Sequence, residues 1–126
     1  MHRSRLAGFI IDCKTDDLES AARFWSAALG YSLKSTAEEN SPKYRGLQTG
    51  HDEVHIEVQT VDHPSRVHLD IETDNVDAEV ARLEQLGARR IEKVHTWVVM
   101  EAPTGQRFCV VRPQRDEFAT RSHTWK

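Results

Sequence analysis

The sequence contains few cysteines and few glycines, and each shortage excludes a class of protein. Its two cysteines, Cys13 and Cys109, cannot form the disulfide framework of a small secreted domain, and they do not form a CxxC motif. We therefore expect two free, largely buried thiols. The six glycines do not form a glycine-rich phosphate-binding loop. Candidate site residues must therefore be sought among the other polar side chains.

Long apolar runs and basic clusters are absent as well. The apolar stretch near the N-terminus is short and ends at Asp12, so we predict neither a membrane span nor a signal peptide. The net charge is −3, and lysines and arginines are scattered, which argues against a nucleic-acid partner. With 126 residues, 38% of them hydrophobic and 29% charged, we expect a single cytoplasmic globular domain over residues 1–126.

An internal repeat divides this domain into two halves. Residues 9–19 align with residues 67–77, and in both an apolar strand passes through Thr-Asp-Asp or Thr-Asp-Asn into a helix that ends at Leu-Gly. We place module one at about residues 5–61 and module two at about 65–112. A single sheet with one helix leaves one sheet face uncovered, so we expect the two modules to pack together.

Each half contains a helix with recognisable ends. In the first half, Asp16 with Glu19 predicts a capping box and Gly30 predicts the end. In the second half, Asp74 or Asn75 is the expected cap, and the helix stops at the next Leu-Gly pair. Apolar residues recur at helical spacing in both. These stripes are Leu18, Ala21, Ala22, Trp25 and Leu29 in the first helix, and Val76, Val80, Leu83 and Leu86 in the second.

Strand patterns follow each helix. In the first half we predict strands at residues 44–49 and 53–60, after a loop at 33–42. In the second half we predict strands at 95–101 and 106–112, joined by a turn. Each module therefore consists of a strand, a helix and then two or three strands, which makes the fold class α+β.

The order and spacing of these motifs resemble the vicinal-oxygen-chelate superfamily (glyoxalase / bleomycin-resistance / extradiol-dioxygenase), and most closely its small glyoxalase-like domain proteins. The resemblance covers about residues 5–112. It implies two tandem βαβββ modules that form an incomplete curved barrel, with helices outside and a concave cleft inside, and it implies a homodimer. The matching segments are Asp17-Leu18-Glu19, Phe24-Trp25, Leu29-Gly30, Val67 to Ile71, Ala81-Arg82-Leu83, Leu86-Gly87-Ala88 and Pro103 to Cys109.

The same resemblance implies positions for a divalent metal. Enzymes of the superfamily usually hold one metal with four inward-facing side chains, and these positions fall here at Ile10, at Gln59 or Glu57, at His68 and at Cys109. Ile10 has no donor atom, and Cys109 stands where many of these enzymes carry glutamate. The ligand set departs from the metal-binding pattern, which leaves His68, Glu57 and Gln59 as candidate ligands.

Strand alternation predicts which side chains face the cleft. On residues 66–72 we assign Val67, Leu69 and Ile71 to the core face, so the intervening polar residues face the other way. Glu57 and His68 are the candidate catalytic residues. The full predicted cleft consists of Asp12, His55, Glu57, Gln59, His68, Asp70, Trp97, Arg107 and Cys109.

Three functions are compatible with this pattern. The first is a small-molecule-binding protein of unassigned ligand, without a full catalytic metal site. The alternative is a divalent-metal-dependent lyase or isomerase, or a dioxygenase-type enzyme, acting on a substrate with vicinal oxygens. The third is an interaction module whose main surface is a dimer interface. A nucleophilic pair of Cys109 and His68 is also conceivable, but the sequence identifies no third residue to orient it.

The last segment, residues 113–126, is polar, with Phe118 and Trp125 widely spaced. Such a tail is either disordered or lies across the cleft or a partner subunit. The sequence leaves these alternatives open.

Overall fold

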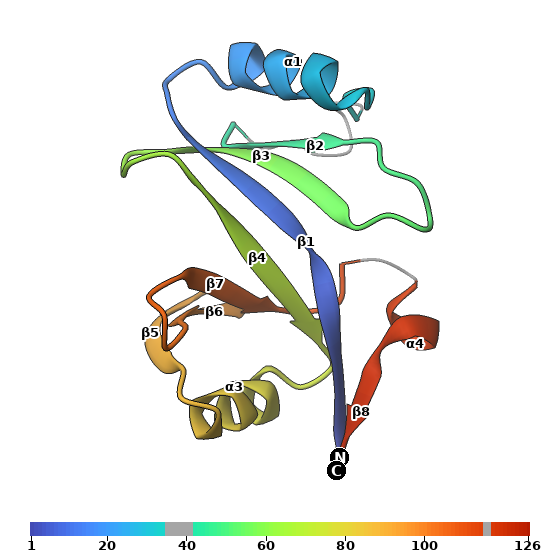
Figure 1. Cartoon of the computed structure of the whole chain (residues 1–126), viewed down its shortest axis with the longest axis vertical. Helices are drawn as coiled ribbons and strands as arrows, with labels where there is room; N and C mark the ends of the chain where they lie inside the picture. Colours follow the sequence, from blue (N-terminus) through green and yellow to red (C-terminus); the bar gives the residue numbers. More distant parts are fainter. Residues whose placement is uncertain (35–41, 115–116) are drawn as a thin grey trace. The chain divides into compact units, whose positions relative to one another are not determined.

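The computed structural model describes residues 1–34, 42–114 and 117–126 (Figure 1). The predicted loop at residues 33–42 therefore lies largely outside the described residues. None of the described helices is long and apolar enough to cross a membrane.

Two compact units make up the described chain. We call them the α1 unit (Phe9–Val67) and the α3 unit (Met1–Gly8 together with His68–Lys126). Strands β1 (His2–Lys14) and β4 (Arg66–Thr73) contribute residues to both units.

The helix of the α1 unit, α1 (Leu18–Leu29), begins one residue later than the sequence predicts. Asp17, and not Asp16, is the N-cap, and its side chain accepts a hydrogen bond from the backbone N–H of Ser20 at 3.1 Å. Ser20 therefore stands where a capping box needs an acidic residue, and the Glu19 carboxylate instead pairs with Arg45. The predicted end is confirmed, because Gly30 adopts a left-handed conformation with φ of 79°.

The sheet of the α1 unit follows the order β2-β3-β1-β4. Strands β2 (Tyr44–Leu47) and β3 (His55–Val61) are antiparallel, with Leu47 opposite Ile56, and they confirm two of the predicted strands. Helix α1 packs against both. Leu47 and Val58 are fully buried, whereas Leu29, the last residue of the helix, is exposed although we predicted it in the core stripe.

The helix of the α3 unit, α3 (Val76–Gln85), resolves the choice of cap. Asn75 caps it, because its side chain accepts a hydrogen bond from the backbone N–H of Ala78 at 3.0 Å. Gly87 follows with φ of 106° and ends the helix as predicted. Leu86, however, is exposed. At about 100° per residue it lies roughly 90° from the centre of the apolar stripe.

The sheet of the α3 unit continues from β4 in the order β4-β7-β6-β5. Strands β6 (Trp97–Glu101) and β7 (Arg107–Val111) confirm the two predicted strands of module two. Strand β5 (Arg89–Val94) was not predicted. It is the last strand in this order and is almost entirely exposed, so its charged sequence carries no apolar alternation.

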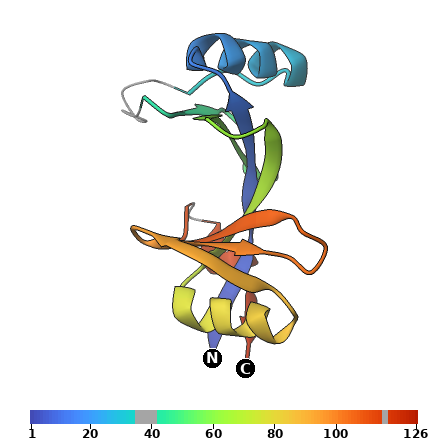
Figure 2. The same ribbon diagram turned by 90° about the vertical axis from the view of Figure 1, so that its left-hand side faces the viewer.

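Helix α3 packs against β5, β6 and β7 and covers the apolar face of this sheet (Figure 2). The predicted core face of β4 is only partly correct. Ile71 packs against this core, but Leu69 and Val67 are 43% and 59% exposed. Burial along β4 increases toward its C-terminal end, where Glu72 and Thr73 are buried. The buried core consists of Val80, Leu83, Val98, Met100, Phe108 and Val110.

The predicted α+β class is confirmed as an open, mixed sheet with helices. Module two has the full strand-helix-strand-strand-strand order, from β4 through α3 to β7. In the described part of module one, β1, α1, β2 and β3 follow the same order, and Leu33 adds an isolated bridge to Leu47. The concave cleft stays a prediction.

The C-terminal tail is ordered where it is described, so disorder is a wrong expectation for those residues. It forms a short helix, α4 (Phe118–Arg121), and a short strand, β8 (His123–Trp125), which pairs antiparallel with the start of β1. Arg3 donates hydrogen bonds to Ser122 Oγ at 2.9 Å and to backbone carbonyls of α4. The tail thereby becomes part of the α3 unit.

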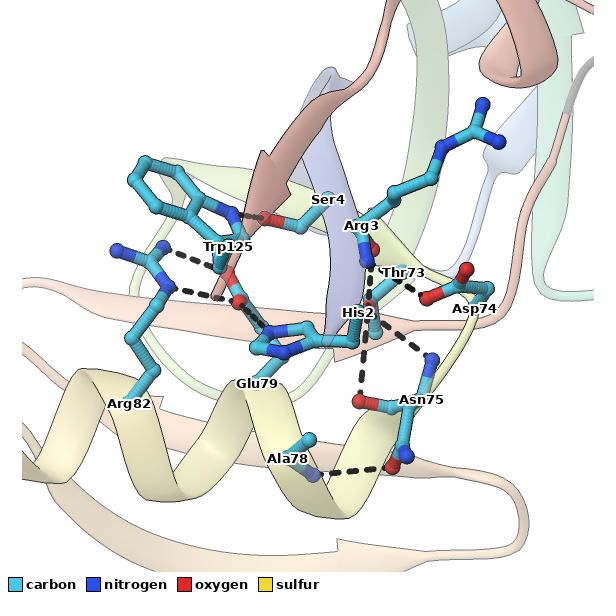
Figure 3. Close-up of polar contacts among 10 residues, drawn as sticks. All are labelled: His2, Arg3, Ser4, Thr73, Asp74, Asn75, Ala78, Glu79, Arg82 and Trp125. Carbon is cyan, nitrogen blue, oxygen red and sulfur yellow. Dashed lines mark hydrogen bonds and ion pairs between the residues drawn. The ribbon is translucent and has the colours of Figure 1, made fainter.

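A buried carboxylate lies beneath this tail (Figure 3). Glu79 on α3 is fully buried and accepts two hydrogen bonds from Arg82, at 2.9 and 2.8 Å. Its Oε1 also lies 2.8 Å from His2 Nε2. The Arg82 guanidinium carbon lies 3.8 Å from the centre of the Trp125 ring, and Trp125 Nε1 donates to Ser4 Oγ at 2.7 Å. We call these five residues the Glu79 cluster.

Replacing Trp125 with alanine is expected to lower the free energy of unfolding by about 1–2 kcal/mol, because it removes a cation–π contact and a hydrogen bond. Urea unfolding followed by circular dichroism measures this. Lys126→Ala changes the exposed neighbouring residue and should leave the midpoint unchanged. Equal midpoints for Trp125→Ala and wild type would show that the Trp125 side chain contributes nothing to stability.

Candidate functional site

Three ionisable side chains meet on one face of the sheet in the α3 unit. Strands β4 and β7 run parallel, with Asp70 opposite Cys109 and Ile71 opposite Val110. Val110 lies in the core beneath α3, so alternation along the strands turns Cys109 and Asp70 to the other face. His68 lies two residues before Asp70 and shares its face. We call His68, Asp70 and Cys109 the β4–β7 cluster.

The three side chains of this cluster are close together. One potential ligand atom from each lies within 4.8 Å of the other two. His68 Nε2 lies 3.5 Å from Asp70 Oδ1, and these two side chains are only 12% and 14% exposed. That separation is too long for a good hydrogen bond. Among the described residues, Asp70 Oδ1 is a buried oxygen that accepts no hydrogen bond.

The other predicted residues of the α3 unit lie on neighbouring positions. Arg107 precedes Cys109 by two residues on β7, and its Nε lies 3.8 Å from Glu101 Oε2. Val99 on β6 stands opposite Cys109, so it borders the β4–β7 cluster with an apolar side chain. Trp97 lies two residues before Val99 on the same strand, at the far end of that face. This face therefore combines polar groups with a partly exposed apolar border.

Four predicted residues lie in the α1 unit. Asp12 has Arg66 as a neighbour, His55 and Glu57 lie close to each other, and Gln59 lies on the same strand as these two. Asp12 is almost fully buried, with Oδ2 3.7 Å from Arg66 Nε. His55 Nε2 lies 3.4 Å from Glu57 Oε2 on β3. Gln59 stands opposite Tyr44 on the neighbouring strand β2. Whether this group and the β4–β7 cluster face a common cleft stays a prediction.

The four-ligand metal set implied by the resemblance does not fit this chain. Ile10 is a buried aliphatic side chain, so the first of the four positions has no donor atom. At the second position, Glu57 is paired with His55. A metal site in this protein therefore cannot use all four implied positions.

Sequence reasoning missed a buried ion pair beside the cluster. Arg5 Nε on β1 lies 2.8 Å from Glu72 Oε1 on β4, and Glu72 Oε2 accepts a hydrogen bond from the backbone N–H of Gln114 at 2.7 Å. Alternation does place Glu72 on the face of His68 and Asp70. The sequence contains no signal that Arg5, far away along the chain, is its partner.

Both cysteines are free, as predicted, but each is half-buried and not fully buried. Burial raises the pKa of the Cys13 thiol above its ordinary value of 9.0, and the Asp12 charge adds to the increase. A hydrogen bond with Trp25 offsets part of it.

The raised pKa predicts the pH dependence of alkylation at Cys13. In a Cys109→Ser variant, the rate of reaction with iodoacetamide should reach half of its maximum above pH 9.0, because only the thiolate reacts. Mass spectrometry of quenched samples gives the rate at each pH. Restricted access lowers the rate at every pH but does not move the midpoint, so a midpoint at or below pH 9.0 would contradict this assignment.

Several solved structures are similar in fold to this protein over most of its chain. A Legionella pneumophila NAD-dependent benzaldehyde dehydrogenase is similar with a TM-score of 0.62 and 9% identity, covering 84% of this chain and 99% of that one. The hypothetical protein BH1468 of Bacillus halodurans gives a TM-score of 0.61 and 16% identity, covering 90% and 98%. A Streptomyces coelicolor methylmalonyl-CoA epimerase in complex with 2-nitronate-propionyl-CoA gives a TM-score of 0.50 and 15% identity. The likeness covers 86% of this chain and 98% of that one.

At these identities the structural likeness concerns the fold alone. No curated protein matches the sequence significantly. Residues 8–111, however, match the sequence profile of the glyoxalase-like domain family. This chain therefore belongs to the glyoxalase-like domain family.

Proposed function

We propose that the protein binds a small molecule on the sheet face that carries the β4–β7 cluster. The observation that carries this proposal is the close grouping of His68, Asp70 and Cys109, three chemically different polar groups on a partly buried surface. Membership of the glyoxalase-like family supports it, since these domains typically bind small molecules. The similar fold of the Streptomyces epimerase, with 2-nitronate-propionyl-CoA bound, supports it as well.

The chemistry of the face suggests the class of ligand. An imidazole and a thiol can donate hydrogen bonds, and the Asp70 carboxylate has a free acceptor oxygen, so the cluster suits a compound with several polar atoms. Val99 borders the cluster and provides an apolar contact. A compact molecule with adjacent oxygen atoms and a small apolar part matches this surface.

A thermal-shift panel tests the proposal on EDTA-treated protein. The panel contains 2-hydroxy acids, hydroxamates and catechols, each matched with an analogue that lacks one of the two oxygens. We expect at least one vicinal-oxygen compound to raise the melting temperature by at least ~2 °C. His68→Ala should abolish that increase and His51→Ala, an exposed histidine outside the cluster, should preserve it. Equal increases for His68→Ala and wild type, or none in the panel, would refute the proposal.

The second candidate is a lyase or isomerase that acts on a substrate with vicinal oxygens through a divalent metal. The specific observation that favours it is the buried Asp70 Oδ1, which accepts no hydrogen bond among the described residues and lies beside His68. A bound metal would act as a Lewis acid on the substrate oxygens. Conversion of a vicinal-oxygen substrate that requires added metal would favour this candidate over simple binding.

We also propose a homodimer, as the family resemblance implies. Leu6 on β1 and Leu69 on β4, both in the α3 unit, are 40% and 43% exposed and would gain from burial in an interface. Light scattering coupled to size-exclusion chromatography should give about twice the chain mass of 14.4 kDa. A mass of 14.4 kDa at every concentration would contradict the dimer.

A further inference from the structure

We propose that His68, Asp70 and Cys109 form a three-residue binding site for a thiophilic divalent cation, with zinc as the expected ion. The inference deepens the proposed function, because it assigns an inorganic ligand to the same cluster. It does not require that an organic molecule binds.

The donor atoms determine which cation fits. The cluster offers an imidazole nitrogen, a carboxylate oxygen and a thiolate sulfur, and zinc accepts all three types. Magnesium and calcium prefer sites made of oxygen alone. Three protein ligands leave the fourth position of a tetrahedral zinc ion open, as in zinc sites that bind water or a substrate.

The distances support metal coordination. Two ligands on tetrahedral zinc, each about 2.0–2.1 Å from the metal, are about 3.3 Å apart. His68 Nε2 and Asp70 Oδ1 are 3.5 Å apart, which is close to that value and too long for a good hydrogen bond. Cys109 Sγ lies within 4.8 Å of the other donor atoms, a spacing at which the three side chains could hold one ion.

The surroundings also favour an ion. Backbone pairing of β4 with β7 holds Asp70 and Cys109 side by side, so the site needs no rearrangement of the main chain. The buried Asp70 Oδ1 accepts no hydrogen bond among the described residues, and a cation would compensate it. In a thiol nucleophile with an orienting carboxylate, Asp70 would instead hydrogen-bond His68, and at 3.5 Å it does not.

This set differs from the one that the family resemblance implies. His68 and Cys109 occupy two of the four implied positions, but Asp70 occupies none of them, and all three residues come from the α3 unit. The site therefore requires no donor from Ile10, whose side chain cannot supply one.

Cobalt titration of the EDTA-treated, full-length protein under reducing conditions tests the site. Cobalt(II) replaces zinc in such sites, and a thiolate ligand produces a charge-transfer band in the near ultraviolet. We expect about one cobalt per chain, a band that Cys109→Ser abolishes, and an affinity that falls at least ~tenfold in His68→Ala and Asp70→Asn. Zinc should displace the cobalt. Matched controls, Cys13→Ser, Asp62→Asn and His51→Ala, should bind as the wild type does.

A second measurement covers the case in which a variant fails to fold. In the wild-type protein, zinc should protect Cys109 from iodoacetamide and leave Cys13 reactive, as peptide mass spectrometry can distinguish. Any of four results would overturn the site. These are the absence of a charge-transfer band, a band that is lost in Cys13→Ser and kept in Cys109→Ser, an unchanged affinity in Asp70→Asn, and no protection of Cys109. The organic panel uses metal-free protein, so failure of the zinc site and failure of small-molecule binding are separate results.

Discussion

Replacing Arg5 with methionine is expected to lower the free energy of unfolding by about 3–5 kcal/mol. Arg5 is the cationic partner of Glu72, a fully buried carboxylate whose Oε2 also accepts a hydrogen bond from the backbone N–H of Gln114. Methionine retains most of the side-chain volume, so the expected loss comes from leaving a buried charge without its counter-ion. Urea unfolding of the two proteins at neutral pH measures the difference.

A double variant separates charge from packing. Arg5→Met with Glu72→Met removes both charges, and it should be more stable than Arg5→Met alone, because no buried carboxylate is left unpaired. Gln114 is exposed, so water can replace the lost acceptor of its N–H group. Arg89→Met, which removes a 72% exposed partner of Glu101, should cost at most about 1 kcal/mol. A double variant no more stable than the single one would refute the buried-charge explanation.

Replacing Glu79 with alanine should have an effect of similar size, about 3 kcal/mol at neutral pH. Glu79 is fully buried and binds both Arg82 and His2. Its removal therefore leaves these two side chains beneath the tail without their shared carboxylate. Glu84→Ala, on the exposed side of the same helix, is the matched control and should change stability by less than about 0.5 kcal/mol. Thermal and urea unfolding measure both variants.

The contribution of Glu79 should disappear in acid. Burial alone would raise the pKa of Glu79, but hydrogen bonds from Arg82, His2 and Ser4, with the Arg82 charge, hold it below its ordinary value of 4.5. A lowered folded-state pKa stabilises the protein above pH 4.5, and this stabilisation is lost as the pH falls through the folded-state value. The stability difference between wild type and Glu79→Ala should therefore shrink below pH 4.5. A difference that stays constant or grows in acid would contradict this assignment.

Much of the local structure could be predicted because its causes are local. The two Leu-Gly helix ends need only a glycine after a helical pattern, and both are present at Gly30 and Gly87. The capping error at Asp16 was one residue, since two neighbouring aspartates offer the same chemistry. Strand β5 was missed because an exposed, charged strand has no apolar alternation to reveal it.

The candidate site could be predicted only in part. His68 and Asp70 are two residues apart on one strand, so alternation alone placed them on one face. The choice of Asp70 as a partner of Cys109 could not be made, because it depends on the register between β4 and β7. The expected burial of Leu69 was wrong for a related reason, since alternation indicates a face but not how far the covering elements extend along it.

The sequence by itself determined the repeat, the two main helices, most of the strands and membership of the glyoxalase-like family, because these depend on residues close together along the chain or on their order. Only the tertiary structure decided three features of the α3 unit. These are the grouping of the β4–β7 cluster, the Arg5–Glu72 ion pair and the Glu79 cluster beneath the C-terminal tail. Each joins residues far apart in sequence, and backbone pairing and burial, which no local pattern encodes, bring them together.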